Sequence, residues 1–187
     1  VDAPAEERKV VSVVFCDLAG FTAHTEGSDP EDVRARLTTY HARVRRDVER
    51  FGGRIEKLMG DGVFAVFGAP VAHEDDPERA VRAAVRIQES VSELNASQPD
   101  LALIVRAAVT TGEAIVQLDD RPDREGIIGD VVNTASRLEA VAEPGTVVVD
   151  ERTDQATRGT IELTPLDSVA LNGKAESVPI WRAAGAR

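Results

Sequence analysis

Residues 54–67 lie in the first half of the chain and read Arg54-Ile55-Glu56-Lys57-Leu58-Met59-Gly60-Asp61-Gly62-Val63-Phe64-Ala65-Val66-Phe67. This stretch contains two short apolar runs, Arg54–Leu58 and Val63–Phe67, joined by four residues that include two glycines and an aspartate. Glycines that flank an aspartate between apolar runs are typical of a β-hairpin. We therefore expect two antiparallel strands with Asp61 at their connection.

A helix is predicted on each side of this hairpin. The earlier one starts at Ser28-Asp29-Pro30-Glu31, a polar cap followed by proline in the first turn. Its apolar side chains then recur at three- and four-residue spacing, which gives one apolar face: Val33, Leu37, Tyr40, Val44 and Val48. The later helix is expected over residues 75–94, and strands are expected at 10–16 and 101–111. The order is therefore β-α-β-β-α-β.

The rest of the chain predicts an extension of this core. A helix is expected over residues 130–141, and short strands are expected at 115–118, 146–149, 161–171 and 178–181. The fold class is accordingly α+β, a ferredoxin-like βαββαβ core with an αββ extension and helices packed on a mostly antiparallel sheet. We expect one domain over residues 10–183, with short tails at 1–9 and 184–187.

Composition and charge exclude several kinds of protein. With 42% hydrophobic and 29% charged residues in 187, the chain has the balance of a folded, soluble domain. A net charge of −11 argues against a nucleic-acid partner, and the apolar runs are too short for a membrane segment. The single cysteine, Cys16, excludes a disulfide framework and favours a reducing, cytoplasmic location. The chain begins with Val1 rather than Met, so the sequence does not decide whether regulatory or membrane segments flank it in a longer protein.

Two aspartates are the first candidates for chemistry. Asp17 ends the predicted first strand, and Asp61 lies at the tip of the hairpin that neighbours this strand in such a fold. Carboxylates brought together repel each other unless a cation neutralises them, and hard oxygen ligands suit Mg²⁺ or Mn²⁺. The simpler alternative is that both are ordinary turn residues, because aspartate is common in turns.

Three motifs resemble one family. Phe15-Cys16-Asp17-Leu18-Ala19-Gly20-Phe21-Thr22 resembles the metal-binding opening of the class III adenylyl and guanylyl cyclases. Lys57-Leu58-Met59-Gly60-Asp61 resembles the hairpin of that family, and Gly129-Asp130-Val131-Val132-Asn133-Thr134-Ala135-Ser136-Arg137 resembles its transition-state helix. The motifs occur in the order and at the approximate spacing of the family. The resemblance covers residues 10–183.

The resemblance implies a two-metal site. Asp17 and Asp61 correspond to the aspartates that bind two Mg²⁺ or Mn²⁺ ions, and the Leu18 carbonyl corresponds to a further ligand. The segment that follows, Ala19, Gly20, Phe21 and Thr22, corresponds to a loop whose N–H groups cradle the triphosphate. The implied substrate is ATP, with GTP as the alternative.

The resemblance also implies the residues that act on the nucleotide. Asn133 corresponds to the residue that orients the ribose, and Arg137 to the one that stabilises charge on the α-phosphate. Lys57 matches the lysine with which adenylyl cyclases read the purine. Gly126, however, stands where adenylyl cyclases usually carry Asp or Thr, and a small residue there is closer to guanylyl cyclases. We therefore expect adenine to be preferred but poorly discriminated.

Near the C-terminus, Leu171-Asn172-Gly173-Lys174 resembles the segment that supplies a basic contact to the triphosphate. Asn172 stands at the usual basic position, and on a strand Lys174 would face the same side, so either residue is a candidate. In the family these halves meet across a subunit interface, which implies a homodimer with two shared sites. The alternative functions are a guanylyl or mixed-specificity cyclase and a catalytically silent module that serves regulation or dimerisation.

Overall fold

The computed structural model describes residues 5–21, 26–119 and 126–187. The elements of the core are β1 (Glu6–Leu18), α2 (Pro30–Arg50), β2 (Arg54–Met59), β3 (Gly62–Phe67), α3 (Asp76–Ser97), a 3₁₀ turn (Pro99–Leu101) and β4 (Val105–Gln117). The remaining elements are β5 (Ile127–Ile128), α4 (Asp130–Val141), β6 (Val147–Asp150), α5 (Glu151–Thr157), β7 (Ile161–Pro165) and β8 (Ile180–Ala186).

One sheet organises the chain, with the strand order β2-β3-β1-β4-β6-β8-β7 and the short β5 paired to β4. The β4–β6 pair is parallel, and the other named pairs in the described residues are antiparallel. Strands β1 and β4 form the centre, because all thirteen residues of β1 have partners on β4. The predicted α+β class, with a mostly antiparallel sheet, is confirmed.

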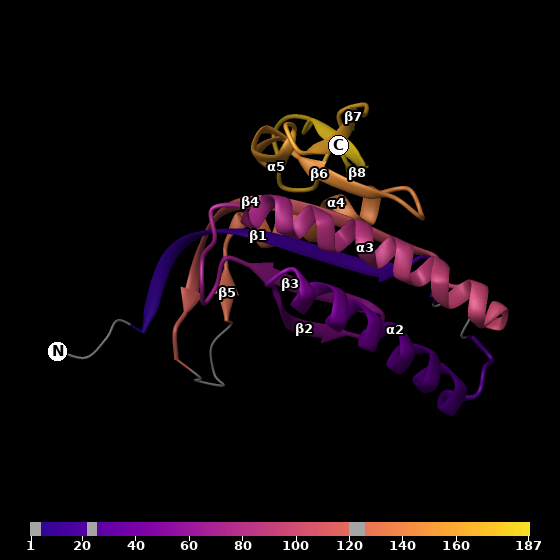
Figure 1. Cartoon of the computed structure of the whole chain (residues 1–187). Coiled ribbons are helices and arrows are strands. Elements are labelled where there is room, and N and C mark those ends of the chain that lie inside the picture. The colour runs from indigo at the N-terminus through magenta and orange to yellow at the C-terminus, as the bar shows by residue number, and fades with distance from the viewer. Residues whose placement is uncertain (1–4, 22–25, 120–125) are drawn as a thin grey trace.

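Helices cover the two faces of the sheet differently. On one face α2 and α3 pack over the centre, and their apolar side chains join Val14, Cys16 and Val109 in the main core. Figure 1 shows α3 lying along β1 and β4. On the opposite face α4 packs through Val131, Ala135 and other apolar residues, together with alternate residues of β1 and β3. A side chain of the sheet is therefore assigned to a face by its position in the strand.

Several predicted elements are confirmed. The helix expected over residues 130–141 is α4 with the same bounds. The helix expected to start at Ser28–Glu31 is α2, and its cap is Asp29, whose carboxylate accepts a hydrogen bond from the N–H of Glu31 at 3.0 Å. The hairpin is β2 and β3. No helix among the described residues is long and apolar enough to cross a membrane.

Other boundaries differ from the prediction. Strand β1 begins at Glu6 rather than at residue 10, because Glu6–Lys9 pair with Ala114–Gln117. The residues expected as separate strands at 101–111 and 115–118 form the single strand β4, preceded by the 3₁₀ turn. At the other end β8 extends to Ala186, which pairs with Ile161. Helix α5 was not predicted.

The strand predicted over residues 161–171 ends at Pro165, and the segment beyond it is different. Residues Leu171–Lys174 form a turn in which the N–H of Lys174 donates to the carbonyl of Leu171 at 3.1 Å. Gly173 has a φ of +83°, a backbone conformation that favours glycine. The prediction that Asn172 and Lys174 share one side of a strand is therefore wrong, because Asn-Gly initiates a turn here.

Candidate functional site

The two predicted metal-binding aspartates lie at the same end of the sheet. Asp17 is the penultimate residue of β1, and Asp61 lies in the connection between β2 and β3. Because β3 pairs with β1 up to Cys16 and Val63, this connection lies beside the end of β1. The Asp61 Oδ2 atom accepts a hydrogen bond from the N–H of Leu18 at 3.1 Å. Asp61 is thereby held next to the residue that follows Asp17.

Asp17 is engaged by an arginine on the neighbouring strand. Arg106 is its cross-strand partner on β4. The Nε atom of Arg106 lies 2.9 Å from Oδ1 of Asp17, and its Nη2 atom lies 3.5 Å from Oδ2. This hydrogen bond is the main reason why the pKa of Arg106 is raised above its ordinary value. The pair holds the Asp17 carboxylate in a fixed orientation on the α4 face.

Glu139 of α4 completes this group of charges. Its side chain is 5% exposed, and its Oε1 atom lies 2.7 Å from Nε of Arg106. Burial first, and then the hydrogen bond and negative charge of Asp17, raise the pKa of Glu139 to about 8. The group that we call the Arg106 cluster (Asp17, Arg106 and Glu139) thus contains two carboxyl groups and one cation.

The chemistry of these residues fits a hard divalent cation. Three carboxyl groups lie at this end of the sheet, those of Asp17, Asp61 and Glu139, and Arg106 supplies one guanidinium. The acidic groups therefore outnumber the cation. Within residues 5–21, 26–119 and 126–187, however, no three acidic, histidine or cysteine side chains gather closely enough to enclose an ion. Mg²⁺ is commonly held by one or two carboxylates together with water and substrate phosphates. Asp17 and Asp61 could hold such an ion.

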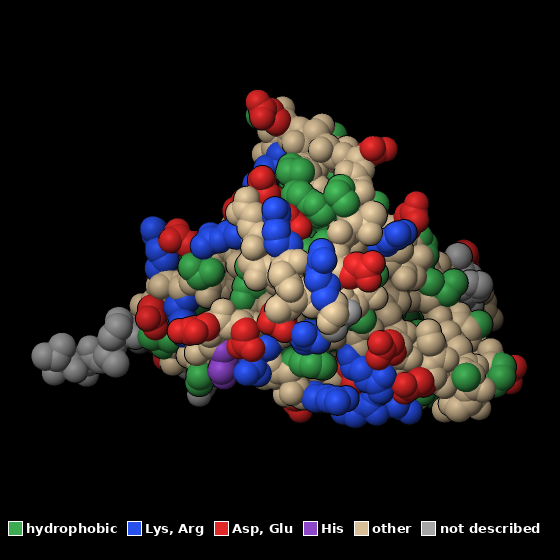
Figure 2. Space-filling view, turned by 45° about the horizontal axis from the view of Figure 1, so that its top comes forward, with side chains coloured by type: hydrophobic (Ala, Val, Ile, Leu, Met, Phe, Trp, Pro, Cys, Tyr) green, Lys and Arg blue, Asp and Glu red, His purple; other side chains and the backbone are tan. Residues whose placement is uncertain are grey.

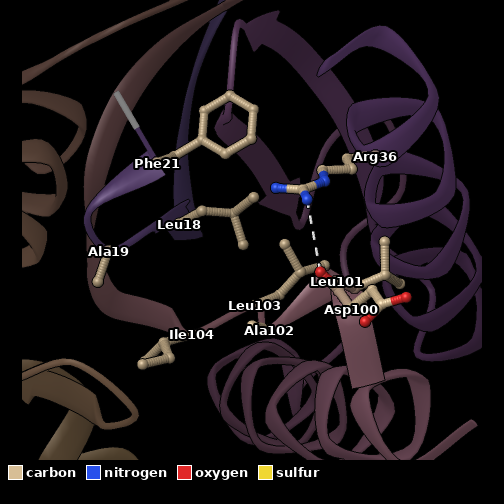
Figure 3. A pocket seen from close by; sticks show the side chains of 9 residues that line it. All are labelled: Leu18, Ala19, Phe21, Arg36, Asp100, Leu101, Ala102, Leu103 and Ile104. Carbon is tan, nitrogen blue, oxygen red and sulfur yellow. Dashed lines mark hydrogen bonds between the residues drawn. The ribbon is translucent and has the colours of Figure 1, made fainter. Parts of the chain in front are cut away.

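The predicted phosphate loop borders a small pocket. This pocket has a volume of about 200 Å³ and is lined by Leu18, Ala19, Phe21 and residues of α2 and of the turn before β4. Figure 3 shows Arg36 of α2 at its edge, where Nη2 lies 3.4 Å from the carbonyl of Asp100. Pockets for small molecules commonly span about 300–1,000 Å³. A nucleoside triphosphate would not fit in this pocket alone.

The backbone of the loop is partly engaged already. The N–H of Leu18 donates to Asp61, and the N–H of Ala19 donates to the carbonyl of Ile104 at 2.7 Å. A cradle that uses the described part of the loop would therefore rely on Gly20 and Phe21. Thr22, which was also predicted to bind substrate, lies outside the described residues.

The predicted transition-state residues lie on the outer side of α4. Asn133 is exposed and Arg137 is half-buried, whereas Val131, Thr134 and Leu138 face the core. The guanidinium of Arg137 lies against Gly173, about 3.1 Å from where a β-carbon at that residue would stand. Lys174 forms an ion pair with Asp130 in the first turn of the same helix. The structure thus brings Lys174 close to α4, and Asn172 has an exposed side chain in the turn.

Asp17 and Arg137 point to different places within one chain. Glu139, two residues after Arg137, is buried against Arg106 and Asp17. Residues two apart on an α-helix project about 200° apart. Arg137 therefore points away from the Asp17 side of α4, toward the turn that contains Gly173.

The two predicted purine-reading positions lie near each other. Lys57 is exposed on β2, opposite Phe64 of β3. Gly126 precedes β5, and a β-carbon there would lie only 1.9 Å from Oε1 of Glu56, the residue before Lys57. Figure 1 shows β5 beside the β2–β3 hairpin. The side chain of Glu56 is therefore the nearest group of β2 to Gly126.

Comparison with known proteins identifies the family. Residues 3–181 match the family described as the adenylate and guanylate cyclase catalytic domain. The chain belongs to this cyclase family. The adenylyl cyclase CyaB from P. aeruginosa has the same fold, with a TM-score of 0.90 and 27% identity over 97% of both chains. The guanylyl cyclase Cya2 matches with a TM-score of 0.91 and 30% identity over 98% of this chain and 96% of that chain.

Curated relatives point the same way. Adenylate cyclase 1 of Rhizobium meliloti is 31% identical over 185 residues, which cover 95% of this chain. These residues span only 28% of that relative, so the cyclase domain described here corresponds to a small part of it. Because the chain is similar to both an adenylyl and a guanylyl cyclase, these comparisons do not decide whether its substrate is ATP or GTP.

Two residues of this cyclase domain were missed by sequence reasoning. Arg106 is a charged residue within the apolar run Val105–Val109, and Glu139 lies among the buried positions of α4 next to Leu138. A charge at a position that should be buried is a signal for a polar partner. The partner itself could not be identified, because 33 positions separate the two residues in the sequence.

Figure 2 adds a view of the surface charge. Acidic and basic side chains are interspersed on the face that it shows, and Lys and Arg side chains gather along its lower edge. The net charge of −11 is therefore not spread as a uniform negative field on this face. An anionic substrate is not excluded by the net charge, because local charge governs its approach.

Proposed function

We propose that this cyclase domain converts ATP to 3′,5′-cyclic AMP and pyrophosphate by two-metal-ion catalysis at the interface of a homodimer. The observation that carries the proposal is the hydrogen bond from the Leu18 N–H to Asp61, which holds the second aspartate against the residue that follows Asp17. Such a reaction belongs in the cytoplasm, where ATP is available.

The aspartates provide the metal-binding half of the site. Asp17 and Asp61 would hold Mg²⁺ or Mn²⁺, with the Leu18 carbonyl as a further ligand. Bound there, the ions would lower the pKa of the ribose 3′-hydroxyl and neutralise the phosphates. To bind a cation Asp17 must share its oxygens with Arg106. Arg106 would then lie beside the bound cation as a second source of positive charge.

Helix α4 and strand β2 provide the other half of the site. Asn133 would hold the ribose, and Arg137 would stabilise the charge that develops on the α-phosphate as the 3′-oxygen attacks and pyrophosphate leaves. A guanidinium suits this task because it is planar and always charged. Lys57 would donate a hydrogen bond to N1 of adenine, which is an acceptor, whereas N1 of guanine carries a proton.

Two features support a homodimer. Arg137 and Asp17 point to different sides of α4, so one copy does not gather all of these residues around one substrate. In addition, large apolar side chains are exposed at the end of β2 and on β5: Leu58, Met59 and Ile128. In an isologous dimer Asp17 and Asp61 of one copy would face Lys57, Asn133 and Arg137 of the other.

Mixing two inactive variants tests the shared site. Asp17→Ala and Arg137→Ala should each lose cyclic AMP formation, and an equimolar mixture should regain activity, because one of the two sites in a mixed dimer carries no substitution. Two copies of the same variant mixed together are the control. Absence of recovery, with mixed dimers demonstrated by differently tagged chains, would refute the shared site.

The basic contact to the triphosphate is proposed to be Lys174 rather than Asn172. Lys174 lies at the N-terminal end of α4 and is paired with Asp130, close to Arg137. Lys174→Ala should raise KM for ATP about tenfold, the loss expected for one charge-assisted hydrogen bond. Asn172→Ala, a change in the same turn, should leave KM within about twofold. The opposite order would assign the contact to Asn172.

A guanylyl or mixed-specificity cyclase is the second candidate. It is favoured by Gly126, which offers no acceptor to the amino group of adenine, and by the similarity to the guanylyl cyclase Cya2. Cyclic nucleotide assays with ATP and GTP under the same conditions distinguish the two candidates. Formation of cyclic GMP at the higher kcat/KM would replace the adenylyl proposal with this one.

A further inference from the structure

Glu56 occupies the space beside Gly126. A β-carbon built on Gly126 would lie 1.9 Å from Oε1 of Glu56 and 3.1 Å from its carboxyl carbon. Real β-carbons do not approach other atoms this closely, so any larger residue at 126 would displace Glu56. The missing side chain of Gly126 therefore lets Glu56 of β2 approach closely. The Glu56 carboxylate occupies the space that a side chain at position 126 would fill.

A bulge in β2 directs Glu56 to this place. Ile55 pairs with Ala65 and Lys57 with Phe64, so Glu56 is an extra residue opposite β3. Such a bulge redirects side chains. Lys57 lies on the same face as Phe64, because paired residues share a face, and Phe64 belongs to the α4 side of the sheet. Glu56 contacts Gly126, next to Ile127, which belongs to that side as well.

Arg54 fixes the orientation of the Glu56 carboxylate. Its Nη2 atom lies 3.1 Å from Oε2 of Glu56, whose side chain is 17% exposed. The other oxygen, Oε1, is the atom closest to position 126. One oxygen is thus bound by arginine, and the other is directed toward the residue where a purine-reading side chain is expected.

We infer that Glu56 reads the purine together with Lys57 and supplies the acceptor that Gly126 lacks. This inference rests on the proposed function, since it takes Lys57 and Gly126 as the purine-reading positions. A lysine donor beside a carboxylate acceptor matches the edge of adenine, where N1 accepts and the 6-amino group donates. With Lys57 facing N1 and Glu56 facing the 6-substituent, the same pair opposes guanine, where N1 donates and O6 accepts. Glu56 is a specificity-determining residue, and it restores the preference for ATP.

The first test compares both nucleotides in steady-state kinetics. Glu56→Ala should lower kcat/KM for ATP about tenfold to a hundredfold, because the 6-amino group loses its acceptor, and it should not lower kcat/KM for GTP. Glu162→Ala, which removes an exposed glutamate of β7, is the control and should keep the ATP preference. An unchanged ATP-to-GTP ratio in Glu56→Ala, or an equal change in Glu162→Ala, would overturn the inference.

A pair of rescue variants tests the shared space directly. Gly126→Asp alone should impair activity with ATP, because the new side chain displaces the Glu56 carboxylate and sets two carboxylates close together. The double variant Glu56→Ala with Gly126→Asp should regain the ATP preference, since the new aspartate then occupies the vacated space. Gly126→Asp with wild-type kinetics, or a double variant no better than Glu56→Ala, would contradict the inference.

Binding separates this inference from the proposed function. Calorimetry with ATP or GTP in the presence of Ca²⁺ measures purine preference without turnover. If the wild type binds ATP over GTP and Glu56→Ala loses this preference, while neither forms cyclic nucleotide, then the proposed function fails and the inference stands. If cyclic AMP forms and Glu56→Ala binds and turns over both nucleotides as the wild type does, then the inference fails and the function stands.

Discussion

Replacing Glu139 by glutamine should change how the stability of the metal-free domain depends on pH. In the folded chain the pKa of Glu139 is about 8, against an ordinary value of 4.5, because the carboxyl is buried beside Asp17. Between these two values the folded state keeps a proton that the unfolded state loses. The stability that this proton provides is complete below about pH 4.5 and is lost as the pH rises toward 8.

The slope follows from the number of protons bound. When the folded state binds one proton more than the unfolded state, the free energy of unfolding falls by at most about 1.4 kcal/mol for each unit by which the pH rises. Across about pH 5 to pH 8 the wild type should therefore lose up to a few kcal/mol more than Glu139→Gln. Glutamine keeps a similar shape and cannot ionise, so the variant lacks this part of the slope.

Urea unfolding in EDTA, followed by circular dichroism at several pH values, measures this difference. Glu143→Gln is the matched control, because Glu143 is an exposed glutamate just after α4 and its replacement should retain the wild-type slope. Parallel pH dependences for the wild type and Glu139→Gln would refute the conclusion that Glu139 holds a proton within the Arg106 cluster.

Two further predictions concern the core. Gly53→Ala should lower the free energy of unfolding by about 1–3 kcal/mol, because its β-carbon would lie 2.5 Å from the buried ring of Phe67. Gly159→Ala is the control, because its β-carbon meets nothing within 4 Å and should leave stability in urea nearly unchanged. Equal stabilities of the two variants would contradict this prediction. Cys16 is fully buried, and burial raises the pKa of its thiol to about 12, so a thiol reagent at about pH 8 should modify it only after unfolding; rapid modification of the folded protein would contradict its burial.

Sequence patterns predicted the long elements of the fold well. The helix over residues 130–141 and the hairpin at Asp61 have strong local signals, namely apolar spacing and turn residues. Helix α5 was missed because its seven residues are too short for apolar periodicity to be visible. Asn172-Gly173 was assigned to a strand although this dipeptide is a strong turn signal, and the observed turn corrects the assignment.

The candidate site was predictable only where its residues lie in motifs. The order of the strands predicts that Asp17 and Asp61 lie at one end of the sheet, and Asp61 accepts a hydrogen bond from the N–H of Leu18 there. The Arg106 cluster was not predictable, since it depends on a contact between a strand and a helix that lie far apart in sequence. The role inferred for Glu56 depends on a bulge of one residue, which the alternation of apolar residues did not indicate.

If the carboxylates at positions 17 and 61 support cyclisation of a nucleoside triphosphate, the protein should form a cyclic nucleotide that is quantified after incubation with ATP and Mn²⁺. The wild-type protein should form cyclic AMP, and Asp17→Ala should lower the rate at least about a hundredfold while its circular dichroism stays unchanged. Asp167→Ala, which removes an exposed aspartate between β7 and β8, should keep the wild-type rate. Cyclic AMP formation that survives Asp17→Ala would show that this carboxylate is not needed, and no cyclic product from ATP or GTP with the wild type would refute the proposed cyclase activity.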